Sequence, residues 1–417
     1  MSPDLRCKEY FEGRMKPSLS AVHACLEKSN NFYLYDENII YKKIEILRKY
    51  FPQITFLYSI KCNPNFNVLC SIFSHGFGAD AASVGEVELA HRAGLPCENI
   101  YYSSPGKTFE DITSTLDRAI LIADSLDEIR RIQQVAAKRN TIVPIGIRIN
   151  PDFSFVGAGG TSSKFGIDEE QALSFFQKNE CMNINVSGIH VHLKSQELKA
   201  ETLAKYYKRM FTLAEKFQTV CGELSYINMG SGMGIPYEIT DAPLNMEALA
   251  SIVSEELDRY HVTHPNTKIM IEVGRYVVCE SGVYVTPVVD RKVSYGKTYI
   301  ILKNTLNGFI RPSLVQLISR YSTENAPVCS EPLFTSKNAF QFLSLKGGAA
   351  NEIVTLVGNL CTATDVIAEN IRLPHLEYGD IVIMTNAGSY AAALSPMQFS
   401  SQDKPKEFLF TKTGEVK

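Results

Sequence analysis

Short apolar segments rich in β-branched and aromatic residues alternate with segments of helical period through the first 270 residues. Eight such strand candidates occur, at 55–61, 77–81, 99–103, 119–124, 143–150, 186–193, 225–229 and 268–272. Eight repeats of strand and helix over about 220 residues are typical of a (β/α)8 TIM-like barrel. A doubly wound open sheet is the competing architecture. We expect the barrel, because eight is the number of parallel strands that closes one.

After residue 275 the apolar pattern changes to period two, which indicates strands rather than helices. Helical periodicity is scarce there, with VIAENI at 366–371 as a weak exception. The early run FYLYD at 32–36 could pair with this region. The sequence therefore predicts an α/β chain with a barrel at 38–275 and a β-rich domain formed by 1–37 and 276–417.

The composition is that of an ordinary globular protein. Of 417 residues, 45% are hydrophobic and 21% are charged, and 42 basic residues against 45 acidic ones give a net charge of −3. This balance is unlike that of a nucleic-acid binder, and no apolar run reaches the 18 or so residues of a membrane span. The polar start lacks the apolar stretch of a signal peptide, and the ten cysteines include no CxxC pair. We therefore expect reduced thiols, a cytoplasmic location and no metal site.

Catalytic groups of a barrel lie at the carboxyl ends of its strands and in the loops that follow. In this chain those positions hold Lys61, Asp80, Arg148, His192, Glu272, Arg275 and the loop Gly230-Ser231-Gly232. A partly desolvated lysine loses its proton more easily and can form an imine with a carbonyl compound. Glycines at alternate positions let backbone N–H groups approach an anion, and the loop after strand seven of a barrel is a common phosphate site. Glu272 could pair with a protonated ring nitrogen, as the acid of a pyridoxal phosphate site does.

Some of these residues allow other interpretations. A dinucleotide fingerprint would need glycine at position 235, where the chain has Ile235. His190 and His192 share one strand face and could bind a metal, but further ligands are not evident, so a ring-stacking His192 fits better. Cys361 is either a structural thiol or a group that reaches a barrel mouth, its own or that of another subunit.

Eight motifs, in order, resemble the ornithine/diaminopimelate decarboxylase family of fold-type III, alanine-racemase-like enzymes. They are SIKCN around Lys61, GADAAS around Asp80, SKFG at 163–166, GIHVHLKS around His192, the GSG loop, EVGR at 272–275, LCTATD at 360–365 and NAGSY at 386–390. The resemblance covers about residues 30–400. It implies a barrel with a β domain, pyridoxal 5'-phosphate as cofactor, and a homodimer with shared active sites.

The resemblance also implies a role for each matched residue. Lys61 would hold the cofactor covalently, His192 would stack on its pyridine ring, and Glu272 would bond the ring nitrogen with Arg148 in the layer below. Asp80 and Glu86 would lie near the lysine and the ring. The phosphate would be held by Ser195, Gly230, Ser231, Gly232, Gly274 and Arg275, helped by Tyr390. Cys361 and Asp365 would come from the partner subunit, with Cys361 as the proton donor to the α-carbon.

The departures from the family pattern concern the substrate. Thr362 stands where diaminopimelate decarboxylases carry a glutamate that recognises the distal D-configured centre of their substrate. This departure argues against diaminopimelate as the substrate. The stretch LNGFIRPSL lacks the acid that ornithine decarboxylases use, and its Arg311 matches the arginine of the diaminopimelate branch that contacts a distal carboxylate. Thr362, Asp365 and Arg311 are thus the expected substrate-binding residues.

The expected function is pyridoxal-phosphate-dependent α-decarboxylation of an amino acid or amino-acid conjugate with a distal anionic group. The CTxxD pattern resembles decarboxylases of secondary metabolism, of the siderophore or antibiotic type. A diaminopimelate, lysine or ornithine decarboxylase stays open, as do a racemase of the same fold and a non-catalytic homologue that binds a regulator. A dinucleotide oxidoreductase is disfavoured by the glycine spacing. Neither a nucleic acid nor a membrane is expected as a partner.

Overall fold

The computed structural model describes residues 5–13, 15–178, 181–230, 232–238, 240–321, 333–336, 338–349 and 352–417. The chain forms two compact units. The barrel unit consists of Glu45–Gly234 and Pro243–Gly274, and the β-rich unit of Met1–Ile44, Ile235–Ala242 and Arg275–Lys417. Among the helices of the described segments, none combines the length and the apolar character needed to cross a membrane.

Eight parallel strands close the barrel in the order β5-β4-β3-β2-β10-β9-β8-β6, and β6 pairs again with β5. They are β2 (Thr55–Ser59), β3 (Gly78–Ala81), β4 (Ile100–Tyr102), β5 (Ile120–Ala123), β6 (Val143–Asn150), β8 (Ile184–His190), β9 (Tyr226–Asn228) and β10 (Lys268–Val273). A short β7 (Ile167–Asp168) extends the sheet beside β6. Every predicted strand is present, so the predicted (β/α)8 barrel is confirmed.

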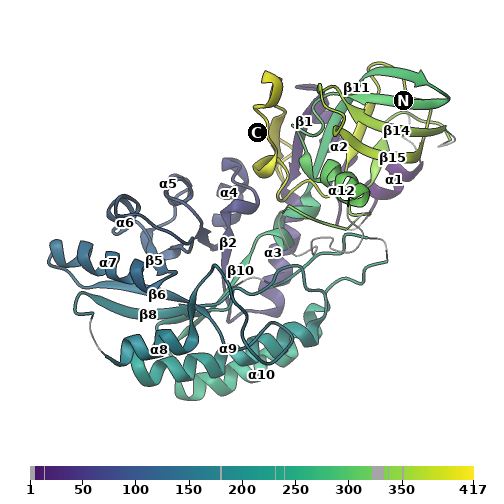
Figure 1. The fold of residues 1–417 in the computed structure, drawn as a ribbon. Helices are drawn as coiled ribbons and strands as arrows, with labels where there is room; N and C mark the ends of the chain where they lie inside the picture. The colour runs from purple at the N-terminus through teal and green to yellow at the C-terminus, as the bar shows by residue number, and fades with distance from the viewer. Residues whose placement is uncertain are drawn as a thin grey trace. The chain divides into compact units, whose positions relative to one another are not determined.

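Helices follow the strands and cover the outside of the barrel, as α7 to α10 do in Figure 1. In chain order they are α4 (Phe66–Phe73), α5 (Val84–Arg92), α6 (Phe109–Thr115), α7 (Leu126–Lys138), α8 (Glu169–Gln177), α9 (Ala200–Cys221) and α10 (Met246–Thr263), while α3 (Glu37–Tyr50) precedes β2. Side-chain caps fix where α6 and α7 begin. Thr108 caps α6 with Asp111 as a capping box, and the Ser125 hydroxyl accepts from the N–H of Glu128 at the start of α7.

Side chains, not solvent, fill the inside of the barrel. Leu57, Tyr101, Ile122, Tyr226 and Met270 pack together there as a buried cluster. Glycines on β6 and β8 provide the room. A Cβ at Gly146 would lie 2.3 Å from the Tyr226 hydroxyl, and a Cβ at Gly188 would lie 2.4 Å from the Tyr226 ring. The filled interior leaves the carboxyl ends of the strands as the place for polar side chains.

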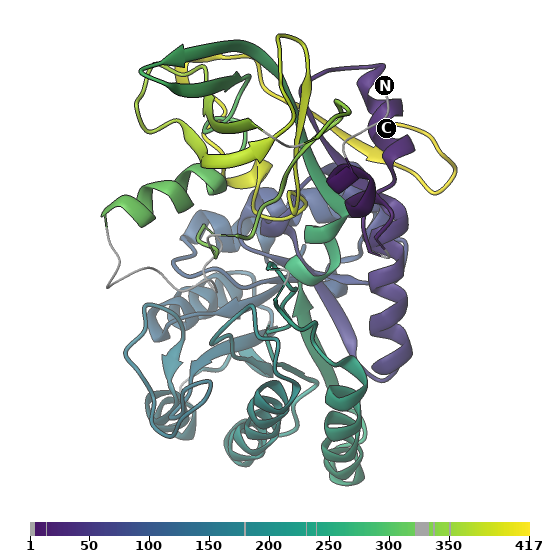
Figure 2. The same cartoon turned by 90° about the vertical axis from the view of Figure 1, so that its right-hand side faces the viewer.

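The β-rich unit is built on one mixed sheet in the order β13-β16-β11-β12-β14-β15, with β1 beside β11 and β17 beside β1 (Figures 1 and 2). Its elements are α1 (Leu5–Phe11), α2 (Leu19–Leu26), β1 (Phe32–Asp36), α11 (Arg275–Val278), β11 (Gly282–Ser294), β12 (Lys297–Leu302), α12 (Ile310–Tyr321), β13 (Phe342–Ser344), β14 (Glu352–Gly358), β15 (Val366–Leu373), β16 (Ile381–Met384) and β17 (Lys406–Phe410). The expected pairing of 32–36 is confirmed, since β1 pairs with β11 and β17.

Two local expectations in this unit change. The weak helix expected at VIAENI is wrong, because these residues lie in β15 and pair antiparallel with β14. Pairing with a neighbouring strand outweighs local propensity there. Helix α12 was not expected from the pattern. It begins at Ile310 and holds Pro312 in its first turn, where a proline costs no hydrogen bond.

Candidate active site

Lys61 and Asp80 form an ion pair at the carboxyl end of the barrel. Lys61 lies in the single turn η1 (Ile60–Cys62) directly after β2, and its Nζ is 2.8 Å from Asp80 Oδ2. The Ser103 hydroxyl donates to the other carboxylate oxygen of Asp80 at 2.5 Å. Asp80 is fully buried, whereas 41% of the Lys61 side chain is exposed. The pair therefore presents an accessible amine over a buried negative charge.

Glu86 is a second carboxyl group beside this pair. It lies in the first turn of α5, where its Oε2 accepts from the N–H of Ala82 at 2.7 Å. Burial raises the pKa of Glu86 to about 7; the Ala82 hydrogen bond and Lys61 oppose this rise, and the charge of Asp80 adds to it. Glu86 is thus half protonated near neutral pH.

We expect Glu86 to make the stability of the cofactor-free protein fall as pH rises from 5 to 7. Its raised pKa means that the folded state binds more protons than the unfolded state in this window, so the free energy of unfolding decreases by at most about 3 kcal/mol. The measurement is the free energy of unfolding in urea of the parent protein minus that of Glu86→Gln, which should fall from pH 5 to pH 7. This difference removes the contribution of His192, whose lowered pKa makes stability rise over the same window in both proteins. Glu88→Gln on the same helix is the control, because the Arg118 hydrogen bond lowers the pKa of Glu88 and keeps its titration below this window. An equal change in the free energy of unfolding between pH 5 and pH 7 in Glu86→Gln and in the parent protein would contradict the expectation.

Glu272 lies on β10 in a fully buried polar cluster. Asn228 Nδ2 on β9 donates to Glu272 Oε1 at 3.0 Å, and His190 Nε2 on β8 is 3.1 Å from the same oxygen. Burial alone would raise the pKa of Glu272, but the contact with His190 and the charge of Lys61 hold that pKa well below its usual range. The barrel therefore keeps an ionised carboxylate away from water.

His192 and Arg148 lie beside this carboxylate. His192 Nδ1 is 3.8 Å from Glu272 Oε2, and burial lowers the pKa of His192 to about 3 against the attraction of Glu272. The imidazole is therefore neutral at physiological pH. Arg148 NH1 on β6 is 3.5 Å from Asp124 Oδ1, and its guanidinium lies 4.4 Å from the ring centre of Phe165 in the SKFG motif.

The predicted phosphate loop is shaped for a close approach of backbone. Gly230 has a φ of +64°, and a Cβ there would lie 2.2 Å from the carbonyl oxygen of Val191. A Cβ at Gly274 would lie 2.1 Å from Cys62 Sγ, so neither position accepts a side chain. The loop that carries Ser195 runs alongside, since Glu197 N–H donates to the carbonyl of Gly232 at 2.8 Å. Ser231 lies outside the described residues.

The β-rich unit holds a second cluster, built around one phenol. Arg275 NH1 and Arg311 NH2 donate to the Tyr237 hydroxyl at 2.5 and 3.2 Å, and both guanidinium groups are buried. Arg275 also lies 5.2 Å from the ring centre of Tyr390, and Arg311 NH1 donates to the carbonyl of Ser389. Among the described residues, no carboxylate forms an ion pair with either arginine, and Arg275 Nε and NH2 and Arg311 Nε have no hydrogen-bond partner. Two buried positive charges without an acid are suited to bind anions.

Cys361 lies on an exposed turn of the same unit. Its Sγ is 3.8 Å from the hydroxyl of Ser400, and Thr362 shares a hydrogen bond with Thr364. Asp365 is buried and accepts from the N–H groups of Leu306 and Leu360 at 3.0 and 3.1 Å. Asp365 therefore holds the turn that presents the cysteine.

The structure thus places the predicted residues in two units. The barrel unit brings together Lys61, Asp80, Glu86, Arg148, His192, Ser195, Gly230, Gly232, Glu272 and Gly274. The β-rich unit brings Arg275, Arg311 and Tyr390 into one cluster and carries Cys361, Thr362 and Asp365 on a separate turn.

The family model "Pyridoxal-dependent decarboxylase, pyridoxal binding domain" matches residues 37–279, which is more than half of the chain. The chain belongs to the pyridoxal-dependent decarboxylases. It is therefore an enzyme, a carboxy-lyase that depends on pyridoxal 5'-phosphate and acts on an amino acid.

Known proteins similar to this decarboxylase act on different substrates. L-glutamyl-[BtrI acyl-carrier protein] decarboxylase of Niallia circulans is 31% identical over an alignment of 393 positions, which covers 91% of this chain and 88% of the relative. Diaminopimelate decarboxylase of Aquifex aeolicus is 28% identical over an alignment of 393 positions, which covers 92% of this chain and 87% of the relative. The crystal structure of diaminopimelate decarboxylase from Helicobacter pylori complexed with L-lysine has a TM-score of 0.80 at 25% identity, covering 94% of this chain and 95% of that chain.

The barrel unit of this decarboxylase fits pyridoxal phosphate. Gly230 and Gly274 lack room for a Cβ because Val191 and Cys62 pack against them, and no side chain therefore stands between their backbone and a bound phosphate. The buried, ionised Glu272 suits a protonated pyridine nitrogen, and the Lys61 amine suits an aldehyde.

Four polar residues of these clusters were not predicted from the sequence. Ser103 and Asp124 are the last residues of two predicted strands, so the rule that catalytic groups follow barrel strands could have found them. Asn228 opens the NMGSG segment, two residues before Gly230. Tyr237 had no usable signal, because its role depends on the contact of its hydroxyl with two arginines from distant parts of the sequence.

Proposed function

We propose that this decarboxylase removes the α-carboxyl group from an amino acid or amino-acid conjugate that carries a distal anionic group, in secondary metabolism of the siderophore or antibiotic type. The observation that supports this proposal best is the pair of buried arginines around Tyr237. Arg311 would bind the distal anion of the substrate and Arg275 the cofactor phosphate, so two anions would balance two buried positive charges. A cytoplasmic location is proposed with it.

The residues of the chain would divide the work as follows. When bound, pyridoxal phosphate draws the electron pair left by loss of CO2 into its pyridine ring. Glu272 would hold the proton on the ring nitrogen, and neutral His192 would lie against the ring without adding charge. Lys61 would hold the cofactor in place and give way to the substrate amine. Thr362 would line the substrate site from the turn that Asp365 holds.

A CO2-release screen tests the proposed substrate class. The panel is lysine, ornithine, diaminopimelate, and glutamyl, citryl or nucleotide conjugates of amino acids. We expect the highest kcat/KM for a substrate with a distal anion other than diaminopimelate, because Thr362 stands in place of the family's glutamate. Highest activity on lysine or ornithine would contradict the proposal, and highest activity on diaminopimelate would establish the second candidate, which the Aquifex and Helicobacter relatives favour. A protein that neither binds the cofactor nor releases CO2 would be the non-catalytic homologue.

Arg311→Met should lower kcat/KM for the anionic substrate about 100-fold, because a buried charge-assisted hydrogen bond to the distal group is lost. The neutral analogue without that group should lose less than about threefold, so the ratio of the two kcat/KM values is the measurement. Arg311→Lys keeps the positive charge but cannot form two parallel hydrogen bonds. Its kcat/KM for the anionic substrate should lie between those of the wild type and Arg311→Met. Arg291→Gln, which removes a partly exposed ion pair with Glu352 in the same unit, is the control for folding. An equal loss on both substrates would argue against recognition of an anion.

The exposed turn with Cys361 supports a homodimer in which each cysteine serves the partner's barrel as proton donor. Mixing inactive Lys61→Ala and Cys361→Ala subunits and allowing them to exchange should then restore activity. Random pairing gives half mixed dimers with one intact site each, so about a quarter of wild-type activity is expected. No recovery after proven subunit exchange would contradict shared sites.

A further inference from the structure

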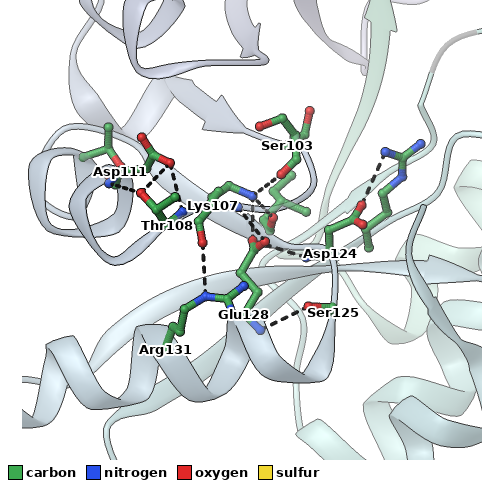
Figure 3. Close-up of polar contacts among 12 residues, drawn as sticks. Ser103, Lys107, Thr108, Asp111, Asp124, Ser125, Glu128 and Arg131 are labelled. Carbon is green, nitrogen blue, oxygen red and sulfur yellow. Dashed lines mark hydrogen bonds and ion pairs between the residues drawn. The ribbon is translucent and has the colours of Figure 1, made fainter. Parts of the chain in front are cut away.

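Lys107 and Glu128 form a completely buried ion pair between two helix starts of the barrel, and Figure 3 shows them facing each other. Lys107 Nζ is 2.7 Å from Glu128 Oε1, and neither side chain has any exposed surface. Lys107 precedes the N-cap Thr108 of α6, and Glu128 lies in the first turn of α7 after the N-cap Ser125. The pair thus joins the loops that follow β4 and β5.

The Lys107 ammonium group is fully bonded. Besides Glu128, it donates to the carbonyl oxygens of Ser104 at 2.6 Å and Ile122 at 2.7 Å. An ammonium has three protons, so each has an acceptor. Lys107 therefore ties the loop after β4 to the end of β5 and to α7.

Each end of this link leads to a charged group of the candidate site. On the β4 side, Ser103 precedes the bonded carbonyl of Ser104 and donates its hydroxyl to Asp80, the partner of Lys61. On the β5 side, the Glu128 carboxylate accepts from the N–H of Asp124 at 3.3 Å. The Asp124 carboxylate in turn faces Arg148, whose NH1 lies 3.5 Å from Asp124 Oδ1.

Fold stability alone does not account for such a pair. Burial lowers the pKa of Lys107 although Glu128 opposes the change, so the charged form carries a desolvation cost. Replacing a buried ion pair by apolar residues of similar volume is often neutral or stabilising, whereas removing one partner is strongly destabilising. The pair forms directed hydrogen bonds to Ser104, Ile122 and Asp124, and apolar residues could not replace these bonds.

From these contacts we infer that Lys107 and Glu128 are positioning residues that set the places of Asp80 and Arg148 at the carboxyl end of the barrel. The inference rests on the proposed function for the roles of those two charges. It assigns the pair no contact with substrate or cofactor. Loss of the pair should displace the Lys61 counter-charge and thereby alter both the chemistry and the titration of the bound cofactor.

The test compares single variants with the double variant Lys107→Met/Glu128→Leu. Each single variant should lower Tm by roughly 5–15 °C because it leaves one buried group unpaired. The double variant should lower Tm by less than the sum of the two single variants, although the Ser104 carbonyl and the Asp124 N–H still lose the partners that the pair provides. The double variant should nevertheless lose about 10- to 100-fold in kcat with little change in KM. The pH midpoint of its visible cofactor band should also shift by about half a unit or more, and hydrogen exchange in the cofactor-free protein should increase at 103–107 and 122–128.

The exposed pair Arg130 and Asp127 on α7 provides the matched control, and Arg130→Gln/Asp127→Asn should leave all four measurements unchanged. A double variant that folds with wild-type kcat, band midpoint and exchange would overturn the inference. If the double variant does not fold, Glu128→Gln is measured instead. Glu128→Gln should fold, lose less kcat than the double variant and shift the pH midpoint of the cofactor band in the same direction. The reason is that its amide nitrogen cannot accept from the N–H of Lys107. Wild-type values in that variant would overturn the inference too. Failure of the proposed function is seen separately, as wild-type protein that binds no cofactor or releases no CO2.

Discussion

Lys61→Ala is expected to abolish the visible absorption of bound cofactor and to reduce decarboxylation at least about 10³-fold. The covalent step needs a primary amine at this position, and the structure provides one that is accessible and held 2.8 Å from Asp80. Two measurements check this. One is the absorbance of protein that was loaded with pyridoxal phosphate and freed of unbound cofactor, and the other is CO2 release under saturating substrate. A variant that keeps both would show that the amine at position 61 is not the attachment point.

Two further variants separate chemistry from charge. Lys61→Arg keeps a positive charge opposite Asp80 but has no amine for the covalent bond, so it should be as inactive as Lys61→Ala. Lys194→Ala is the matched control. Lys194 is about as exposed as Lys61, at 37% against 41%, and has its own acidic partner, Glu197, at 3.0 Å. It should keep the cofactor band, and a loss there equal to that of Lys61→Ala would contradict the assignment.

Glu272→Gln is expected to reduce kcat about 10²- to 10³-fold while the cofactor stays bound. An amide lacks the charge that stabilises a protonated pyridine nitrogen, and electrostatic groups of this kind contribute that much in a water-excluded site. The contacts from Asn228 and His190 hold the side chain in place, and the substituted amide has nearly the same volume as the carboxylate. Steady-state kcat, with the visible band as evidence of bound cofactor, checks the expectation.

Glu169→Gln is the matched control for this variant. Glu169 is also a buried carboxylate of the barrel unit, paired with Lys216 at 2.6 Å and accepting from the N–H of Asp152 at 3.0 Å. Its removal should change stability but leave kcat within about threefold. If both variants lost kcat equally, the loss would reflect the removal of a buried charge rather than the function of Glu272.

The barrel could be predicted from the sequence because its signal is local and repeated. Each parallel strand is buried on both faces, so it reads as a short apolar run, and the following helix reads as an amphipathic one. The β-rich unit has weaker local signals. Residues 366–373 have a helix-like pattern but become β15, because Ile353 to Val357 of β14 supply hydrogen-bonding partners that no local pattern contains.

The candidate site could be predicted where one residue type carries the chemistry. A lysine after β2, an acid on β10 and glycines after β9 are recognisable as single residues. The network among them is not. Asn228 joins Glu272 to the phosphate loop, since its Oδ1 accepts from the N–H of Gly230 at 2.9 Å, and asparagine has no single expected role. The positioning role inferred for Lys107 and Glu128 likewise depends on contacts near the ends of β4 and β5, which the sequence alone does not indicate.

Borohydride reduction of the cofactor-loaded protein, followed by peptide mass spectrometry, tests the central claim most directly. Reduction fixes the bond between cofactor and lysine, and we predict one pyridoxyl phosphate group per chain, on the peptide that contains Lys61. Modification of another lysine, or none despite cofactor-dependent CO2 release, would contradict the account.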